Sequence, residues 1–280
     1  MNQAPATSGR VQGRRRRVGT IANHGVAIEV AGLPFLIESD SAEFLHLVAT
    51  RTAWLTATGS RQPVLNIHYT VTPGDHTWPR EGGPPFSIEG SGTAARIVGE
   101  FFAATVDLTT RSVRASGPLS LFLIDTIIRA VLPELFGDVL LLHSCVLARD
   151  NKAWVCSGPS GAGKSTLLSL LPGLAVGDEL AILTRHRDTL CVRPLWTDER
   201  NRRSLEVESV FLLEHGNRHS RRAVGPAEGF RRLARETSWP ILSSEATERT
   251  FVMLAWLIDH ASLWNLRFTP DPGVLEALGG

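Results

Sequence analysis

Apolar and polar residues alternate in short runs through the first part of the chain, a pattern that predicts β-strands. The runs with this pattern lie at 25–30, 64–69 and 103–108. Residues 41–50 instead have helical spacing, with Ser39 or Ser41 as the cap. Prolines and glycines gather between 72 and 85 and predict a loop there. We therefore expect a β-rich unit with antiparallel pairing.

The pattern changes after Ser-Gly-Pro at 116–118, which we take as a domain boundary. We place a β-rich N-terminal domain at 21–116 and a second domain at 117–280. Residues 1–20 are rich in arginine, and no acidic residue precedes Glu29. This composition predicts a solvated basic tail rather than an arm that binds nucleic acid.

The second domain is predicted to contain longer elements. Residues 119–135 have helical spacing of leucine, isoleucine and valine and predict a buried helix. An apolar run at 139–147, a tight turn at 149–152 and a second run at 153–156 predict a β-hairpin. Further strands are expected at 174–183, 189–192 and 207–213, and amphipathic helices at 226–236 and 245–260.

The hairpin runs directly into residues 158–165, which match the phosphate-binding loop pattern G-x-x-x-x-G-K-[ST] at every fixed position. Backbone N–H groups of such a loop close around phosphate oxygens. Lys164 can reach the β- and γ-phosphates, and the Ser165 hydroxyl can ligate Mg²⁺. The residues expected to bind the nucleotide are Gly158, Pro159, Ser160, Gly161, Ala162, Gly163, Lys164, Ser165 and Thr166. The sequence thus predicts a site for a nucleoside triphosphate.

Two adjacent acids follow this loop after one short helix and a turn. The strand that carries Asp178 and Glu179 should return them to the phosphate side of the sheet. Only one of two neighbouring residues in a regular strand can face the loop, but Gly177 permits a bulge that would present both. One acid could then accept the proton of an acceptor group, and the other could hold Mg²⁺ directly or through water.

His143 interrupts the apolar run at 139–147. A lone histidine in such a strand is more often a core residue than a catalytic one. Its strand, however, is predicted to pair with the strand that enters the loop, which moves His143 to the edge of the site. We expect it to bond a phosphate oxygen or the carboxylate. Arg185, Arg187 and Arg193 could clamp phosphates, although surface solvation is the more ordinary role for each.

Other classes of nucleotide-binding protein fit the sequence less well. A GTPase would carry Asp-x-x-Gly and Asn-Lys-x-Asp after the loop, and neither motif is present. A dinucleotide-binding fold would need G-x-G-x-x-G, but its third glycine would fall at Thr166. A motor-type ATPase would place an acid after a late apolar strand. Glu214 has that position and is the alternative metal ligand.

The composition of the chain indicates which binding partners and which cellular compartment to expect. The net charge of +1 gives no overall attraction to nucleic acid or to a membrane surface. No apolar stretch is long enough for a membrane span, and no secretory signal follows the N-terminal arginines. The three cysteines show no metal-binding spacing. We therefore expect a cytoplasmic protein with no membrane partner.

The order His143-Ser-Cys-Val, then the loop at 158–165, then Gly177-Asp178-Glu179 resembles the HPr kinase/phosphorylase family, which is related to phosphoenolpyruvate carboxykinase. The resemblance spans roughly 118–215. It implies an α/β fold, with a P-loop kinase domain of this type preceded by a smaller β-rich α+β domain. It also implies that Asp178 is the general base toward a serine, that His143 helps set that acid and contacts phosphate, and that Lys164 and Ser165 bind phosphate and Mg²⁺. Glu179 would then join Ser165 at the metal.

Two departures from the family pattern bear on the acceptor. The acidic pair is Asp-Glu, where the bacterial HPr enzymes carry Asp-Asp, and the later Glu-x-Arg-Gly-x-Gly signature is absent. Some relatives phosphorylate a serine of a small peptide. We therefore expect an ATP- and Mg²⁺-dependent kinase that transfers the γ-phosphoryl group to a serine hydroxyl of a protein or peptide. A nucleotide-sensing binding module without catalysis and a small-molecule kinase stay open, as does a homo-oligomer.

Overall fold

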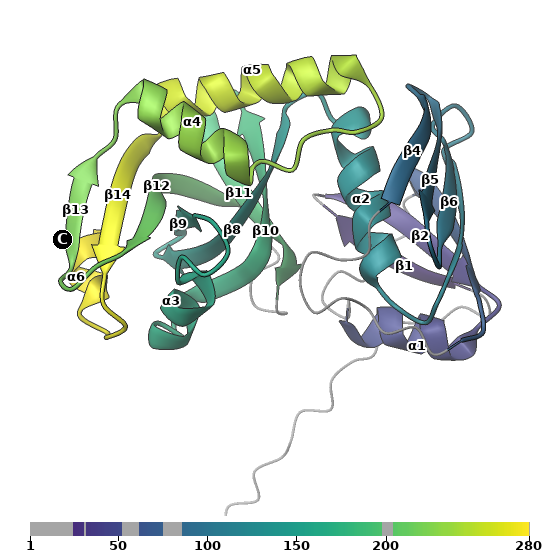
Figure 1. Cartoon of the computed structure of the whole chain (residues 1–280), viewed down its shortest axis with the longest axis horizontal. Coiled ribbons are helices and arrows are strands. Elements are labelled where there is room, and N and C mark those ends of the chain that lie inside the picture. Colours follow the sequence, from purple (N-terminus) through teal and green to yellow (C-terminus); the bar gives the residue numbers. More distant parts are fainter. Residues whose placement is uncertain (1–24, 31, 52–61, 75–85, 198–203, 280) are drawn as a thin grey trace, which may run out of the picture.

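Two seven-stranded sheets lie beside each other in the described part of the chain and are joined by one helix (Figure 1). The computed structural model describes residues 25–30, 32–51, 62–74, 86–197 and 204–279. Both sheets contain parallel and antiparallel pairs, so the protein is of the mixed α/β class. The basic tail at 1–20 and most of the loop at 72–85 lie outside the described residues. Within those residues, no helix combines the length and apolar character needed to cross a bilayer.

The first sheet has the strand order β1-β2-β3-β7-β6-β5-β4. Its elements are β1 (Gly25–Val30), β2 (Leu33–Ser39), α1 (Ala42–Arg51), β3 (Leu65–Val71), β4 (Phe86–Ser91), β5 (Ala94–Gly99), β6 (Ala103–Asp107) and β7 (Ser112–Gly117). β2 pairs parallel with β3, and β3 pairs parallel with β7, so the prediction of an antiparallel unit is wrong at these pairs. Parallel neighbours need a crossover connection, which α1 supplies between β2 and β3. Ser41 caps α1, as expected, by accepting a hydrogen bond from the N–H of Phe44 at 3.2 Å.

The second sheet has the strand order β11-β10-β8-β9-β12-β14-β13, and β11 also pairs with the start of β12. Its strands are β8 (Val139–Arg149), β9 (Lys152–Ser157), β10 (Ala175–His186), β11 (Thr189–Thr197), β12 (Leu205–His215), β13 (Ser220–Ala223) and β14 (Ser262–Phe268). β8 and β9 form the predicted antiparallel hairpin. On its other side β9 pairs parallel with β12, which pairs parallel with β14. The strand that enters the glycine-rich loop therefore has one hairpin partner and one parallel partner, of which only the first was predicted.

Helices cover both faces of the second sheet (Figure 1). They are α3 (Lys164–Leu170), α4 (Pro226–Glu236), α5 (Ser244–His260) and α6 (Val274–Gly279). Along β8, Leu140 and Leu142 pack in one cluster with side chains of α4 and α5, whereas Cys145 and Leu147 pack in another with side chains of α3 and α6. This division follows from the two-residue repeat of a strand, which points successive side chains to opposite faces. The predicted helices at 226–236 and 245–260 are confirmed as α4 and α5.

The helix α2 (Phe122–Leu135) lies between the sheets (Figure 1) and confirms the predicted buried helix. Ile124 of α2 is in one hydrophobic cluster with Ile37 of β2 in the first sheet and with Ile182 of β10 in the second. The chain changes from one sheet to the other after Gly117, close to the predicted boundary. The division into two separate domains stays a prediction.

Candidate active site

The glycine-rich loop joins β9 to α3 in a conformation that requires glycine. Gly161 and Gly163 have φ values of 78° and 98°, in the left-handed region where a side chain is strained. A Cβ atom on Gly163 would also lie 2.7 Å from Cζ of Phe268. Successive backbone N–H groups in such a turn can converge on one point, which makes an anion-binding concavity.

Three parallel strands end at the edge of the sheet that carries this loop. β9 leads into the loop, β12 ends at His215, and β14 ends at Phe268. His215 Nε2 lies 2.5 Å from the carbonyl oxygen of Gly161. The ends of β12 and β14 therefore support the loop from one side. Sequence reasoning missed both residues, since their position becomes informative only once β12 and β14 are known to run parallel to β9.

Lys164 is buried at 8% exposure, and its ammonium group folds back over the loop. Nζ donates hydrogen bonds to the carbonyl oxygens of Gly158 at 2.6 Å and Pro159 at 3.2 Å. An ammonium group has three protons, so one donor remains for a phosphate oxygen. The loop therefore fixes a positive charge at its centre.

Asp178 lies directly beside the loop. The hydroxyl of Ser165 donates a hydrogen bond to Oδ2 of Asp178 at 3.0 Å. Asp178 belongs to β10, which is separated from β9 by β8. The short α3 and the turn after it therefore return the chain to the side of the sheet that carries the glycine-rich loop, as the sequence predicts.

The predicted bulge is present in β10. The register of β10 against β11 shifts between Asp178 and Ala181. Glu179 has a φ of 72°, a left-handed conformation that is uncommon outside glycine. Its backbone N–H donates to Oδ1 of Asp178 at 2.8 Å. Asp178 and Glu179, on either side of this irregularity, both line the same cavity.

His143 lies on β8, beside the strand that enters the loop, as predicted. Its Nδ1 is 3.3 Å from Oε2 of Glu236, the last residue of α4. The Glu236 side chain is only 13% exposed, so the pair is partly shielded from solvent. This contact leaves Nε2 as the ring atom available to the cavity. Sequence reasoning missed Glu236, because 93 positions separate it from His143 and no motif links them.

Two cavities meet at these residues. The smaller, of about 200 Å³, collects most of the predicted site: His143, Ser160, Gly161, Gly163, Lys164, Ser165, Thr166, Asp178 and Glu179. The larger, of about 800 Å³, shares only His143, Ser160 and Glu179 with it. Of the predicted loop residues, Gly158, Pro159 and Ala162 do not line the smaller cavity. The first two hold Lys164, and Ala162 packs in the core beneath the loop.

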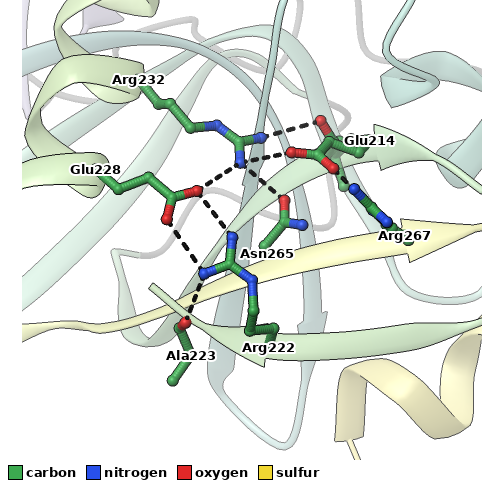
Figure 2. Close-up of polar contacts among 8 residues, drawn as sticks. Glu214, Arg222, Ala223, Glu228, Arg232, Asn265 and Arg267 are labelled. Atoms are coloured by element: carbon green, nitrogen blue, oxygen red, sulfur yellow. Dashed lines mark hydrogen bonds and ion pairs between the residues drawn. The ribbon is translucent and has the colours of Figure 1, made fainter. Parts of the chain in front are cut away.

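Glu214, the alternative metal ligand, belongs to an ion-pair network outside this cavity (Figure 2). Its Oε1 accepts a hydrogen bond from Arg232 at 2.9 Å, and its Oε2 accepts one from Arg267 at 2.9 Å. Burial by itself would raise the pKa of Glu214. Hydrogen bonds from Arg267 and Asn265 and the charge of Arg232 outweigh burial, so the pKa lies below its ordinary value. Both carboxylate oxygens are engaged in holding α4 to the ends of β12 and β14.

The three candidate arginine clamps line neither cavity. The guanidinium of Arg185 lies over the ring of Trp256 at 4.9 Å. Arg193 pairs with Glu29 at 3.5 Å, and the carbonyl oxygen of Arg187 accepts a hydrogen bond from Arg185. Lys164 is therefore the cation that faces the loop cavity in the described part of the chain.

No protein-family model and no curated protein sequence matches this chain. Function is therefore inferred from the residues and their geometry. The oxygen donors of Ser165, Asp178 and Glu179 suit Mg²⁺, which is typically held by one or two carboxylates together with substrate phosphates. Such a site needs no cluster of three protein ligands, and the described residues contain no such cluster of histidine, cysteine, aspartate and glutamate.

Proposed function

We propose that this chain is an ATP- and Mg²⁺-dependent kinase of the HPr kinase/phosphorylase type, which phosphorylates a serine hydroxyl of a protein or peptide. One observation carries the proposal: the Ser165 hydroxyl lies 3.0 Å from Asp178 in a cavity that also contains Lys164. A loop cation, a loop hydroxyl and an acid are the groups that hold phosphates and their metal ion in P-loop enzymes. Glu179 and His143 in the same cavity favour catalysis, since a module that only binds nucleotide does not need a base.

The acidic pair can divide its roles in two ways. The family resemblance makes Asp178 the base and Glu179 a metal ligand. The contact between Ser165 and Asp178 favours the reverse, because Ser165 is the expected metal ligand and Asp178 lines only the smaller cavity. Glu179 lines both cavities and so faces the space from which an acceptor can enter. We assign Mg²⁺ to Ser165 and Asp178, and the acceptor proton to Glu179.

The transfer step follows from this assignment. The acceptor hydroxyl oxygen forms a bond to the γ-phosphorus as the bond between that phosphorus and the β–γ bridging oxygen breaks. The hydroxyl proton passes to Glu179, and Lys164 faces the negative charge that develops on ADP. Bound Mg²⁺ would neutralise charge on the phosphate oxygens. His143 lies 3.3 Å from Glu236 through Nδ1, which fixes the ring, and its Nε2 is left to contact the reacting groups in the cavity.

Incubation of the protein with γ-labelled ATP, Mg²⁺ and either serine-containing peptides or a cell lysate tests the proposal. Label on a protein or peptide supports it. Label on a metabolite would indicate a small-molecule kinase, and nucleotide binding without transfer would indicate a sensing module. Lys164→Ala is the control, because loss of the loop cation should abolish transfer. Transfer at the wild-type rate by Lys164→Ala would exclude this site as the place of the chemistry.

A further inference from the structure

The larger cavity, of about 800 Å³, lies beside the glycine-rich loop and shares a wall with the smaller cavity. Its volume is within the range of about 300–1,000 Å³ found for small-ligand sites. Its walls come from segments far apart in the chain. They are the start of β4, one face of α2, the end of α4 and the segment 237–241. The first sheet therefore contributes to a space that opens on the second.

The position of the larger cavity points to the acceptor side of the reaction. His143, Ser160 and Glu179 line both cavities, whereas Ser165 and Thr166 at the start of α3 line only the smaller. Phosphates lying along the loop would thus have one end at the shared wall and the other end toward Thr166. The γ-phosphate must meet the acceptor, and the shared wall is where a group in the larger cavity can reach it.

Large apolar side chains are exposed on the wall of this cavity. Phe86 is 41% exposed and Ile241 is 39% exposed, which is high for residues of this size. The rings of Phe86 and Phe122 each meet Phe102 edge-on, at centroid distances of 6.4 and 5.8 Å. Phe102 therefore holds both rings in place. Exposed apolar groups gathered at a cavity are typical of a binding site.

Most charged groups of the wall are already paired. The pairs are Asp125 with Arg129 at 2.5 Å and Glu236 with His143 at 3.3 Å. Two charged side chains of the wall, Arg235 and Glu179, have no ion-pair partner among the described residues. Glu179 is the proposed acceptor of the hydroxyl proton. Arg235 is therefore the cation that the wall leaves available to an anionic group of a ligand.

The segment that carries Ile241 is fixed at both ends. The N–H of Ser238 donates to the carbonyl oxygen of Leu141 in β8 at 2.8 Å. The N–H of Gly92, which follows β4, donates to the carbonyl oxygen of Leu242 at 2.6 Å. The segment thus bridges the two sheets, so the wall is formed before a ligand binds. A preformed wall lowers the entropic cost of binding.

We propose that the larger cavity binds the acceptor and selects a peptide whose serine is flanked by a large apolar residue and by an acidic residue. The inference rests on the proposed kinase activity and names its substrate class. The apolar side chain lies against Phe86 and Ile241, and the acidic side chain pairs with Arg235. The serine hydroxyl then reaches Glu179 and the γ-phosphate at the shared wall.

The test uses the whole chain with Mg²⁺, γ-labelled ATP and degenerate peptides that have one fixed serine and varied neighbours. Peptides with apolar and acidic neighbours should be labelled preferentially. Phe86→Ser and Ile241→Ser should each raise KM for these peptides about tenfold, as expected for one lost apolar contact, and leave the Kd of a fluorescent ATP analogue within about twofold. Val252→Ser is the matched control, since Val252 is an apolar residue of α5 with 65% exposure that does not line the cavity.

Charge reversal gives a second, independent readout. Arg235→Glu should change the preferred neighbour of the serine from acidic to basic while total nucleotide binding is unchanged. Weaker binding of the ATP analogue by Ile241→Ser would overturn the inference, because the cavity would then hold the nucleoside. Labelling without regard to neighbours, or of no peptide, would overturn it as well. Failure of the wild-type protein to bind the ATP analogue at all would instead overturn the proposed kinase function.

Discussion

The hydroxyl of Ser165 donates a hydrogen bond to Oδ2 of Asp178 at 3.0 Å, which joins the glycine-rich loop to an acid two strands away. With Mg²⁺ at this pair, Asp178→Asn should weaken Mg²⁺-dependent nucleotide binding at least about tenfold, because a carboxylate ligand becomes neutral. Titration of a fluorescent ATP analogue with and without Mg²⁺ measures the effect. A variant that binds the Mg²⁺–nucleotide normally but does not transfer phosphate would return the base role to Asp178.

The left-handed conformation of Glu179 predicts that activity and stability are opposed at this position. Glycine adopts a φ of 72° without strain, so Glu179→Gly should raise the free energy of unfolding by roughly 0.5–1 kcal/mol. Transfer should fall roughly 10²- to 10⁴-fold, because the base is lost. Chemical denaturation and a labelling assay measure the two effects.

Glu179→Gln separates these effects, since it removes the charge but keeps the side chain. Its rate of phosphoryl transfer should fall as it does in Glu179→Gly, but its free energy of unfolding should not rise. If both variants unfold at the same denaturant concentration, the bulge is not strained.

Glu236 is predicted to act as a positioning residue for His143. Glu236→Gln keeps an acceptor near Nδ1, 3.3 Å away, but replaces the carboxylate beside the ring with a neutral amide. We expect kcat to fall roughly tenfold with little change in KM for ATP. The contact between Glu236 and His143 positions a ring that acts on the phosphoryl group during transfer, and ATP binding depends on the loop instead. Glu248→Gln on the exposed side of α5 is the control and should leave kcat unchanged. Equal loss of nucleotide binding and kcat would indicate a structural role only.

The network around Glu214 predicts a pH dependence of stability (Figure 2). The pKa of Glu214 is lowered in the folded protein from its ordinary value of 4.5, because its hydrogen bonds and the Arg232 charge outweigh burial. The ionised form therefore stabilises the fold fully above that ordinary value, and this contribution is lost as the pH falls through the lowered pKa. The wild-type protein should have a higher Tm than Glu214→Gln near neutral pH. This difference in Tm should become smaller as the pH falls into the acid range. A gap that is constant with pH would show that the network's charge does not stabilise the fold.

Local features of the fold could be predicted because they depend on nearby residues. Helix α4 and the hairpin of β8 and β9 follow from periodicity and turn residues. A bulge at the two acids was also predicted, but its left-handed residue is Glu179 and not Gly177. Parallel pairing could not be predicted, since nothing in β9 alone specifies β12 as a neighbour. For the same reason, the sequence could not identify Glu236 as the partner of His143. Contacts of this kind depend on how distant segments pack, which local spacing does not encode.

The candidate site was predicted as a set of residues, but its shape was not. The phosphate loop, Asp178 and Glu179 were found by motif and spacing, and the structure brings them to one cavity. The larger cavity had no sequence signal, because its wall combines Phe86 with Ile241. Most strands of the second sheet lie between Phe86 and Ile241 in the sequence, and the two residues line one cavity only in the folded protein.

The placement of α2 has a consequence for how the protein can be divided. Ile124 and its neighbours on α2 are buried by side chains from both sheets. A fragment that starts after Gly117 would expose this apolar surface of α2 to water. We therefore expect the fragment to aggregate and to lack activity. Because α2 packs against both sheets, we expect the full chain to unfold in a single thermal transition, and two separate transitions would show that its halves are independent domains.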